Sequence, residues 1–176
     1  MSADASHHGR KNGQTHAARH DLIRSLDDLA LLTAQELRGV YAGGSVPASL
    51  VALDGDLDGR MLAIRRLRHG RFFSALAAIS KSRLFPWAGK RFASSDGERG
   101  KGDNRVRLAG TRHAAPFSTR YGISAIDGHP CIVLDYRGAI HDELREVGPG
   151  IFLGPACLKR PGRAPIALVW FGLHRS

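Results

Sequence analysis

The sequence predicts a mainly β fold, an antiparallel barrel of about eight strands with one or two short helices. Five runs rich in β-branched and aromatic residues occupy 117–124, 130–136, 139–147, 151–158 and 166–174, and this composition is typical of strands. The links between them are short and contain Gly, Pro or Asp, so they form turns and leave no room for crossover helices. Hydrophobic residues make up 43% of the 176 residues, which is enough to bury one core without disulfides. Cys131 and Cys157 fall within these runs, and we expect both to be buried thiols.

The start of the chain differs from the rest in composition. Residues 1–20 are polar, include four His and show no apolar period, so we expect a disordered polar tail there and a single β-barrel domain over 21–176. We predict no metal site and no cofactor, because histidines in a disordered tail lack the fixed geometry that a metal needs. The chain has no run of 18 apolar residues and no signal-like stretch, which predicts a cytoplasmic protein without a transmembrane segment.

Two helical signals follow the tail. Apolar residues recur at helical spacing over 22–32, which predicts one short amphipathic helix. Thr33 and Glu36 have the spacing of a capping box, which predicts a further helical turn after residue 33. We interpret residues 39–44, in which two Gly flank Tyr41, as a strand with a close backbone approach or a sharp bend.

The middle of the chain carries shorter signals. We expect an acidic turn at 54–59, a strand at 61–64, a helix at 72–79, an exposed Gly-rich loop at 93–104 and a strand at 106–108. The aromatic residues within 87–92 are expected to anchor this part to the core. The strands at 39–44, 61–64 and 106–108 bring the total to about eight, which is enough to close a barrel around one small ligand.

Short motifs resemble those of a bacterial protein family. They are the Gly-x-aromatic-x-Gly pattern around Tyr41, the Trp87-x-Gly-Lys-x-Phe92 segment, and the C-terminal runs Asp142-Glu-Leu-Arg-Glu-Val147 and Phe152-Leu-Gly154. With them, residues 36–174 resemble the GxWxG-type proteins of unknown function, whose pattern is that of calycin-like, or lipocalin-like, barrels. The Trp of the family motif is Tyr41 here. The resemblance implies a cup-shaped cavity for an apolar small molecule, and it implies no particular reaction.

The candidate binding residues are aromatic side chains and one lysine. We expect the cavity to be lined by Tyr41, Trp87, Lys90, Tyr121, Tyr136 and Trp170. All of them lie in segments that we assign to the barrel domain.

Alternation along residues 139–147 selects a candidate catalytic residue. Because alternate residues of a strand share a face, this run offers one set with Ile140, Asp142, Leu144 and Glu146 and another with His141, Glu143, Arg145 and Val147. We favour the first set as inward and the second as a solvated ladder outside. Asp142 is then the candidate catalytic residue, since a carboxylate in an apolar barrel has a raised pKa and can act as a general acid or base. The alternatives for Asp142 are a buried ion pair or a cap at a bend of the chain.

The chain is basic, and its charge is concentrated in the middle. The formal net charge is +10, and the segment 60–112 alone contains fourteen basic and three acidic residues. Such a segment can attract phosphates or acidic lipid headgroups, so an anionic partner at this basic segment is one hypothesis. No zinc-finger, RNP or KH pattern accompanies it, and the chain has no G-x-S-x-G nucleophile motif.

Three functions follow as alternatives. The first is binding of a hydrophobic or amphipathic small molecule in the barrel. The second is a non-hydrolytic isomerase or cyclase that uses the same cavity and one acid–base residue, so the sequence leaves open whether the protein is an enzyme. The third is binding of nucleic acid or an anionic surface through residues 60–112. The sequence identifies neither the ligand nor the oligomeric state.

Overall fold

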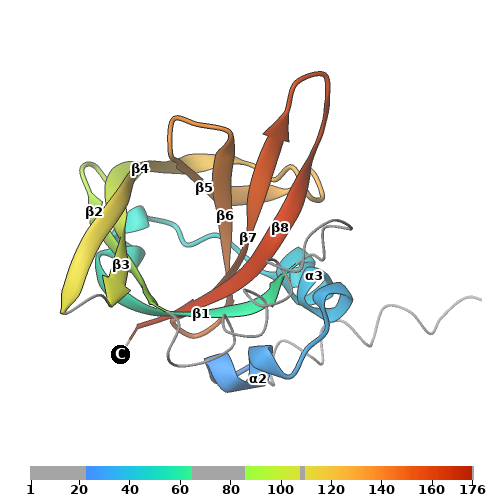
Figure 1. Cartoon of the computed structure of the whole chain (residues 1–176), viewed down its shortest axis with the longest axis horizontal. Helices are drawn as coiled ribbons and strands as arrows, with labels where there is room; N and C mark the ends of the chain where they lie inside the picture. Colours follow the sequence, from blue (N-terminus) through green and yellow to red (C-terminus); the bar gives the residue numbers. More distant parts are fainter. Residues whose placement is uncertain (1–22, 65–85, 108–109, 176) are drawn as a thin grey trace, which may run out of the picture.

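Eight antiparallel strands form one closed barrel. The computed structural model describes residues 23–64, 86–107 and 110–175. Each strand pairs with the next along the chain, and the last pairs with the first (Figure 1). The predicted fold class, an antiparallel barrel of about eight strands with short helices, is therefore confirmed.

The strands follow one another in simple up-and-down order. They are β1 (Gly55–Ile64), β2 (Trp87–Ser94), β3 (Arg99–Arg107), β4 (Thr111–Ile123), β5 (Pro130–Asp135), β6 (Ile140–Gly148), β7 (Ile151–Arg160) and β8 (Arg163–His174). The five runs predicted in the last third correspond to β4–β8. Gly128, Gly150 and Gly162 have positive φ angles in three of the tight turns that connect strands β4–β8, a backbone conformation that favours glycine.

Two helices lie on the outside of the barrel. Within the described residues they are α2 (Leu26–Ala30), which packs against β1 and β8, and α3 (Ala34–Gly43), which packs against β6 and β7 (Figure 1). The predicted capping box is confirmed: the Thr33 side chain accepts a hydrogen bond from the Glu36 backbone, and the Glu36 side chain accepts one from the Thr33 backbone. In the described part of the chain, no helix has the length and apolar character needed to span a membrane.

The strand expected at 39–44 is wrong, because this segment belongs to α3. The capping box starts the helix at Ala34, and Leu37, Val40 and Tyr41 then recur at helical spacing and are buried against the barrel. Apolar residues at this spacing favour a helix over a strand, and this periodicity outweighs the glycines on either side of Tyr41.

Two further segments differ from expectation. Residues 54–59, expected as an acidic turn, begin β1, and residues 93–104, expected as a loop, contain the end of β2 and much of β3. The expected number of strands was right, although the strand at 87–94 takes the place of the one expected at 39–44. The helix expected at 72–79 lies outside the described residues.

The barrel wall separates two apolar clusters. The interior cluster contains Leu50, Leu53, Leu57, Phe92, Phe117, Ile132, Leu134, Leu144, Phe152, Phe171 and Leu173. The outer cluster joins the helices to the wall and contains Ile23, Leu29, Leu37, Val40, Tyr41, Leu62, Val147, Ile151, Leu153 and Trp170. A short 3-10 helix, η1 (Leu50–Leu53), contributes two leucines to the interior cluster and so fills one end of the barrel.

Candidate functional site

An ion pair lies inside the barrel. The Nζ of Lys90 on β2 is 2.9 Å from Oδ2 of Asp142 on β6. Lys90 is 2% exposed and Asp142 is 4% exposed. On β6, Asp142 and Leu144 share the inward face, as the alternation predicts, and Leu144 belongs to the interior cluster. Of the alternatives considered for Asp142, the structure shows the buried ion pair.

Two further polar side chains complete a hydrogen-bonded cluster around this pair. The Lys90 ammonium donates to Oδ1 of Asn104 at 2.8 Å and to the Tyr136 hydroxyl at 2.6 Å. The Tyr136 hydroxyl in turn donates to Oδ2 of Asp142 at 2.6 Å. All three ammonium protons of Lys90 therefore have acceptors. We call Lys90, Asn104, Tyr136 and Asp142 the interior polar cluster.

Aromatic rings surround the ammonium group. The Nζ of Lys90 lies 5.1 to 5.6 Å from the ring centroids of Trp87, Phe117, Tyr136 and Phe171, within the range of cation–π attraction. The indole of Trp87 also donates to Oδ1 of Asn104 at 2.9 Å. Burial lowers the pKa of Lys90, while the carboxylate of Asp142 acts in the opposite direction. The ammonium group of Lys90 is thus stabilised by the surrounding aromatic rings and by the carboxylate of Asp142.

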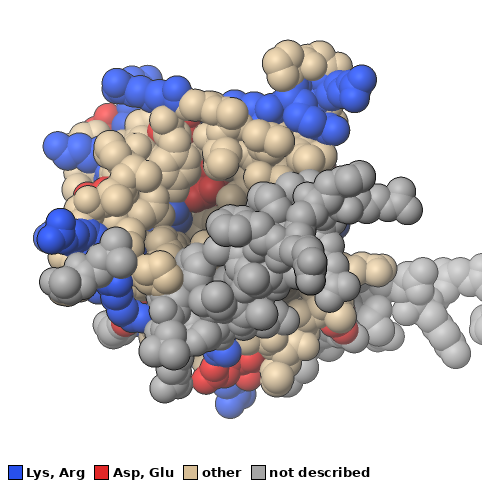
Figure 2. Space-filling model, viewed as in Figure 1, with Lys and Arg blue, Asp and Glu red and all other residues tan. Residues whose placement is uncertain are grey.

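The barrel interior is packed at one end and only partly buried at the other. On the side of η1 the interior is packed, and the gap lined by Leu50, Phe92 and Ile132 does not admit a water-sized sphere. On the side of the β7–β8 hairpin the interior positions are half-buried: Trp87, Tyr136, Ala156, Leu158, Ile166 and Val169. Figure 2 shows a hollow in the face that it displays, with acidic atoms at its bottom. We call the part of the interior towards the β7–β8 hairpin, where these positions are only half-buried, the accessible half, whereas Lys90 and Asp142 themselves are buried.

Four of the residues singled out from the sequence come together here. Trp87, Lys90, Tyr136 and Asp142 all contact one another directly or through Asn104. Asn104 itself was missed, because it lies in a segment that was expected to be a loop. Asn104 lies opposite Lys90 in the β2–β3 register, and this pairing depends on strands that the sequence analysis did not predict.

The other three aromatic residues lie elsewhere. Tyr121 packs at the edge of the interior cluster, and its hydroxyl donates to the Pro47 carbonyl at 2.8 Å. Tyr41 and Trp170 lie in the outer cluster, with their rings in edge-to-face contact and their centroids 5.6 Å apart. The barrel wall therefore separates Tyr41 and Trp170 from the interior polar cluster.

The outward face of β6 is not a solvated ladder, and that expectation is wrong. His141, Glu143 and Arg145 are 8%, 0% and 1% exposed, because α3 and the segment after β4 cover them. The Glu143 carboxylate accepts hydrogen bonds from the hydroxyls of Tyr41 and Ser124. These contacts join helix α3 to the barrel wall.

Two residues in the described part of the basic segment do not present a free positive charge at the surface. Lys90 is buried, and Arg105 pairs with Asp58 at 3.0 Å and with Asp56 at 3.4 Å. In the face that Figure 2 displays, the basic groups of the whole chain lie mainly around the edge of the molecule. Residues 65–85 of this segment lie outside the described residues, so an anionic partner stays a prediction.

Comparison with known protein families, curated proteins and solved structures finds no match to this chain. The closed antiparallel barrel is consistent with the calycin-like fold that the motif resemblance implies, whereas membership of the GxWxG-type family stays a prediction. The fold and the site together define a closed β-barrel with an ion pair in its interior, an architecture compatible with ligand binding.

Proposed function

We propose that this protein binds a small hydrophobic or amphipathic molecule in the half of the barrel interior that faces the β7–β8 hairpin. The observation that supports this proposal is the position of the ion pair between Lys90 and Asp142. The pair is buried between the packed end of the interior and the accessible half. A buried ion pair gains little stability over an apolar core, because the desolvation of both charges offsets their attraction. Its presence here favours a role in recognition.

The lining of the accessible half indicates the chemistry of the ligand. Leu158, Ile166 and Val169 offer apolar walls, and Trp87 adds an aromatic one. Lys90 and Asp142 are buried, whereas Tyr136 and Asn104 are half-buried and are the polar groups that a ligand meets first. The amide nitrogen of Asn104 makes the longest hydrogen bonds of the cluster, 3.3 and 3.4 Å, and is the donor that a ligand can recruit most readily. A mostly apolar molecule with one hydrogen-bonding group fits this arrangement.

The position of the two tryptophans provides a direct test. The chain has two Trp; Trp87 lines the interior, and Trp170 lies in the outer cluster. We expect decanoate or cyclohexanol, neither of which absorbs or emits in the range of tryptophan, to change the emission of Trp87 in a Trp170→Phe variant. The emission of Trp170 in a Trp87→Phe variant should stay unchanged, while native mass spectrometry of that variant shows whether the probe is still bound. Native mass spectrometry of the purified chain checks independently for a retained small molecule.

A blocked variant provides the matched control. Ala156 is half-buried in the interior next to Asp142 in the β6–β7 register, so Ala156→Phe fills the accessible half. Ala164→Phe places the same side chain at an exposed position of β8. We expect only Ala156→Phe to abolish the response to both probes. Equal binding by the two variants, or no response by the wild type and no retained molecule, would refute the proposal.

Acid–base catalysis by Asp142 is the competing use of the same site. The hydrogen bond of 2.6 Å from Tyr136 to Asp142 connects the carboxylate to a half-buried phenol, which is a possible path for a proton. In an isomerase or cyclase of this kind, Asp142→Asn would lower the rate by about 10²–10⁴-fold. In a protein that only binds, the molecules of Asp142→Asn that stay folded should keep most of their ligand affinity, because Tyr136 and Asn104 are unchanged. A thermal unfolding curve of the variant separates a loss of rate from a loss of fold, so the same variant distinguishes the two functions once a ligand is known.

A further inference from the structure

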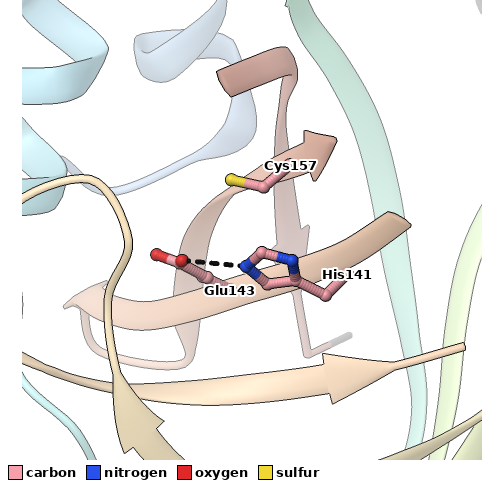
Figure 3. Close-up of side chains that lie close together, drawn as sticks. All are labelled: His141, Glu143 and Cys157. Carbon is pink, nitrogen blue, oxygen red and sulfur yellow. Dashed lines mark hydrogen bonds and ion pairs between the residues drawn. The ribbon is translucent and has the colours of Figure 1, made fainter. Parts of the chain in front are cut away.

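Three side chains of metal-binding type meet on the outer face of the barrel. His141 and Glu143 are two residues apart on β6 and therefore share a face. Cys157 on β7 lies opposite His141 in the β6–β7 register. Figure 3 shows the Glu143 carboxylate directed at the imidazole of His141, with the Cys157 sulfur on the neighbouring strand. One donor atom from each residue lies within 4.8 Å of the other two.

These three side chains are buried, and their polar contacts are incomplete. Glu143 and Cys157 are 0% exposed, and His141 is 8% exposed. The hydrogen-bond donors to Glu143 are the hydroxyls of Tyr41 and Ser124, the backbone of Ala125 and the imidazole of His141, and no Lys or Arg of the described residues is among them. Nδ1 of His141 is buried without a hydrogen-bond partner, which is rare in native proteins.

The orientation of the imidazole suits coordination. Nε2 of His141 is 3.2 Å from Oε1 of Glu143, close to the separation of two ligand atoms bound about 2.0–2.1 Å from one tetrahedral zinc ion. Coordination through Nε2 requires the imidazole proton to move to Nδ1. The hydrogen bond between Nε2 and Oε1 of Glu143 is then replaced by the bonds of both atoms to the metal, and Nδ1, which has no partner in the described structure, becomes the N–H group of the ring.

We propose that His141, Glu143 and Cys157 form a binding site for one Zn²⁺ ion beneath α3. Imidazole nitrogen, thiolate sulfur and carboxylate oxygen are all zinc ligands, whereas Mg²⁺ and Ca²⁺ select oxygen ligands alone. Binding releases the thiol proton of Cys157 to solvent, and the two charges of the ion then balance one thiolate and one carboxylate. The site is covered by protein, so the ion serves to join β6 and β7 and to hold the wall beneath α3.

A second buried thiol on the same face provides a matched control. Cys131 on β5 is also 0% exposed, but it does not belong to the group of three. Burial raises the pKa of the Cys131 thiol to about 12 and raises that of Cys157 as well, so neither thiol is reactive in the absence of a metal. Of these two cysteines, only Cys157 has its sulfur within 4.8 Å of donor atoms of both His141 and Glu143.

The test uses cobalt as a spectroscopic substitute for zinc. Chelator-treated full-length protein is given Co²⁺ in the native state and, separately, during refolding. We expect one Co²⁺ per chain with a thiolate-to-cobalt charge-transfer absorption that Zn²⁺ abolishes. Since the chain has only two Cys and none in residues 1–20, cobalt held by the tail histidines gives no such band.

The variants decide the outcome. Cys157→Ser should lose the absorption band and Cys131→Ser should keep it, and Zn²⁺ should raise the thermal unfolding midpoint of the wild type and of Cys131→Ser only. Glu143→Gln and His141→Gln should weaken cobalt binding at least tenfold, which keeps the test decisive if Cys157→Ser does not fold. Uptake without a thiolate band, no uptake in either preparation, or a band that survives Cys157→Ser would overturn the proposal.

Discussion

Gly59 on β1 lies directly against the indole ring of Trp87. A Cβ atom added to Gly59 would lie 2.5 Å from the nearest ring carbon and 2.6 Å from Cα of Gly89. The ring occupies the space that any other residue at position 59 would fill, and from there its indole nitrogen reaches Asn104. The absence of a side chain at one position of β1 thus helps to place one wall of the interior polar cluster.

Replacing this glycine should therefore disturb both stability and the site. We expect Gly59→Ala to lower the free energy of unfolding by about 2 kcal/mol, as overpacking of a core commonly does, and to change the emission of Trp87. Gly138 is the control, because its nearest contact for an added Cβ is 4.0 Å away, and Gly138→Ala should stay within about 0.5 kcal/mol of the wild type. Urea denaturation measures both variants, and equal effects would contradict the packing argument.

The ion pair in the interior should be strongly coupled. Lys90→Met and Asp142→Asn each leave the other partner buried without its counterpart, which costs about 3–5 kcal/mol. In the double variant neither charge remains, so its loss of unfolding free energy should be smaller than the sum of the single losses by about 2 kcal/mol. Urea denaturation of the wild type, the two single variants and the double variant measures this coupling. Additive losses of unfolding free energy would show that the two charges do not interact.

The pair of Asp127 and Arg145 predicts a dependence of stability on pH. Two hydrogen bonds, of 2.7 and 2.8 Å, join the Arg145 guanidinium to the Asp127 carboxylate and lower the pKa of that carboxyl below its usual range. Because the folded-state pKa is the lower one, this stabilisation is complete above the unfolded-state pKa of about 3.9 and is lost as the pH falls through the folded-state value.

The matching variant is Asp127→Asn. At pH 7 it should be less stable than the wild type by about 3 kcal/mol, since Arg145 is 1% exposed and is left without its carboxylate. Unfolding free energies measured from pH 7 to pH 2.5 should show the difference between the two proteins shrinking below pH 4. A difference that stays constant over this range would contradict the assignment.

Local signals in the sequence predicted strands β4–β8 better than they predicted the structure of the middle of the chain. The strands β4–β8 follow from alternation and from the turn residues between them, because both signals lie within a few neighbouring positions. Residues 93–104 were misinterpreted as a loop since glycines and charges there resemble a turn. Gly102 is in fact required in β3, where an added Cβ would meet the ring of Phe117 at 2.6 Å and the Arg91 carbonyl at 2.2 Å.

The short range of these sequence signals also explains how much of the candidate site could be predicted. Asp142 was recognised from alternation on one strand alone, and the Trp87-x-Gly-Lys90 segment stood out by composition. The partnership between Lys90 and Asp142 could not be derived, because it spans the barrel and depends on how the sheet closes. Trp170 and Tyr41 were grouped with the interior residues by their aromatic character, although only the closed barrel shows which side of the wall each ring occupies.

The hydroxyl of Tyr41 predicts how α3 is held to the barrel. It donates to Oε2 of Glu143 at 2.9 Å, and both residues are buried, so Tyr41→Phe removes a donor from a buried carboxylate. Hydrogen bonds to charged groups contribute about 1.5–3 kcal/mol, and we expect a loss of that size. Tyr121→Phe removes a hydrogen bond to the neutral carbonyl of Pro47 and should cost about 1 kcal/mol. Amide hydrogen exchange should accelerate across α3 in Tyr41→Phe and not in Tyr121→Phe, while the barrel strands keep their backbone hydrogen bonds in both variants. Unchanged exchange in α3 of Tyr41→Phe would mean that the apolar contacts of the outer cluster alone hold the helix in place.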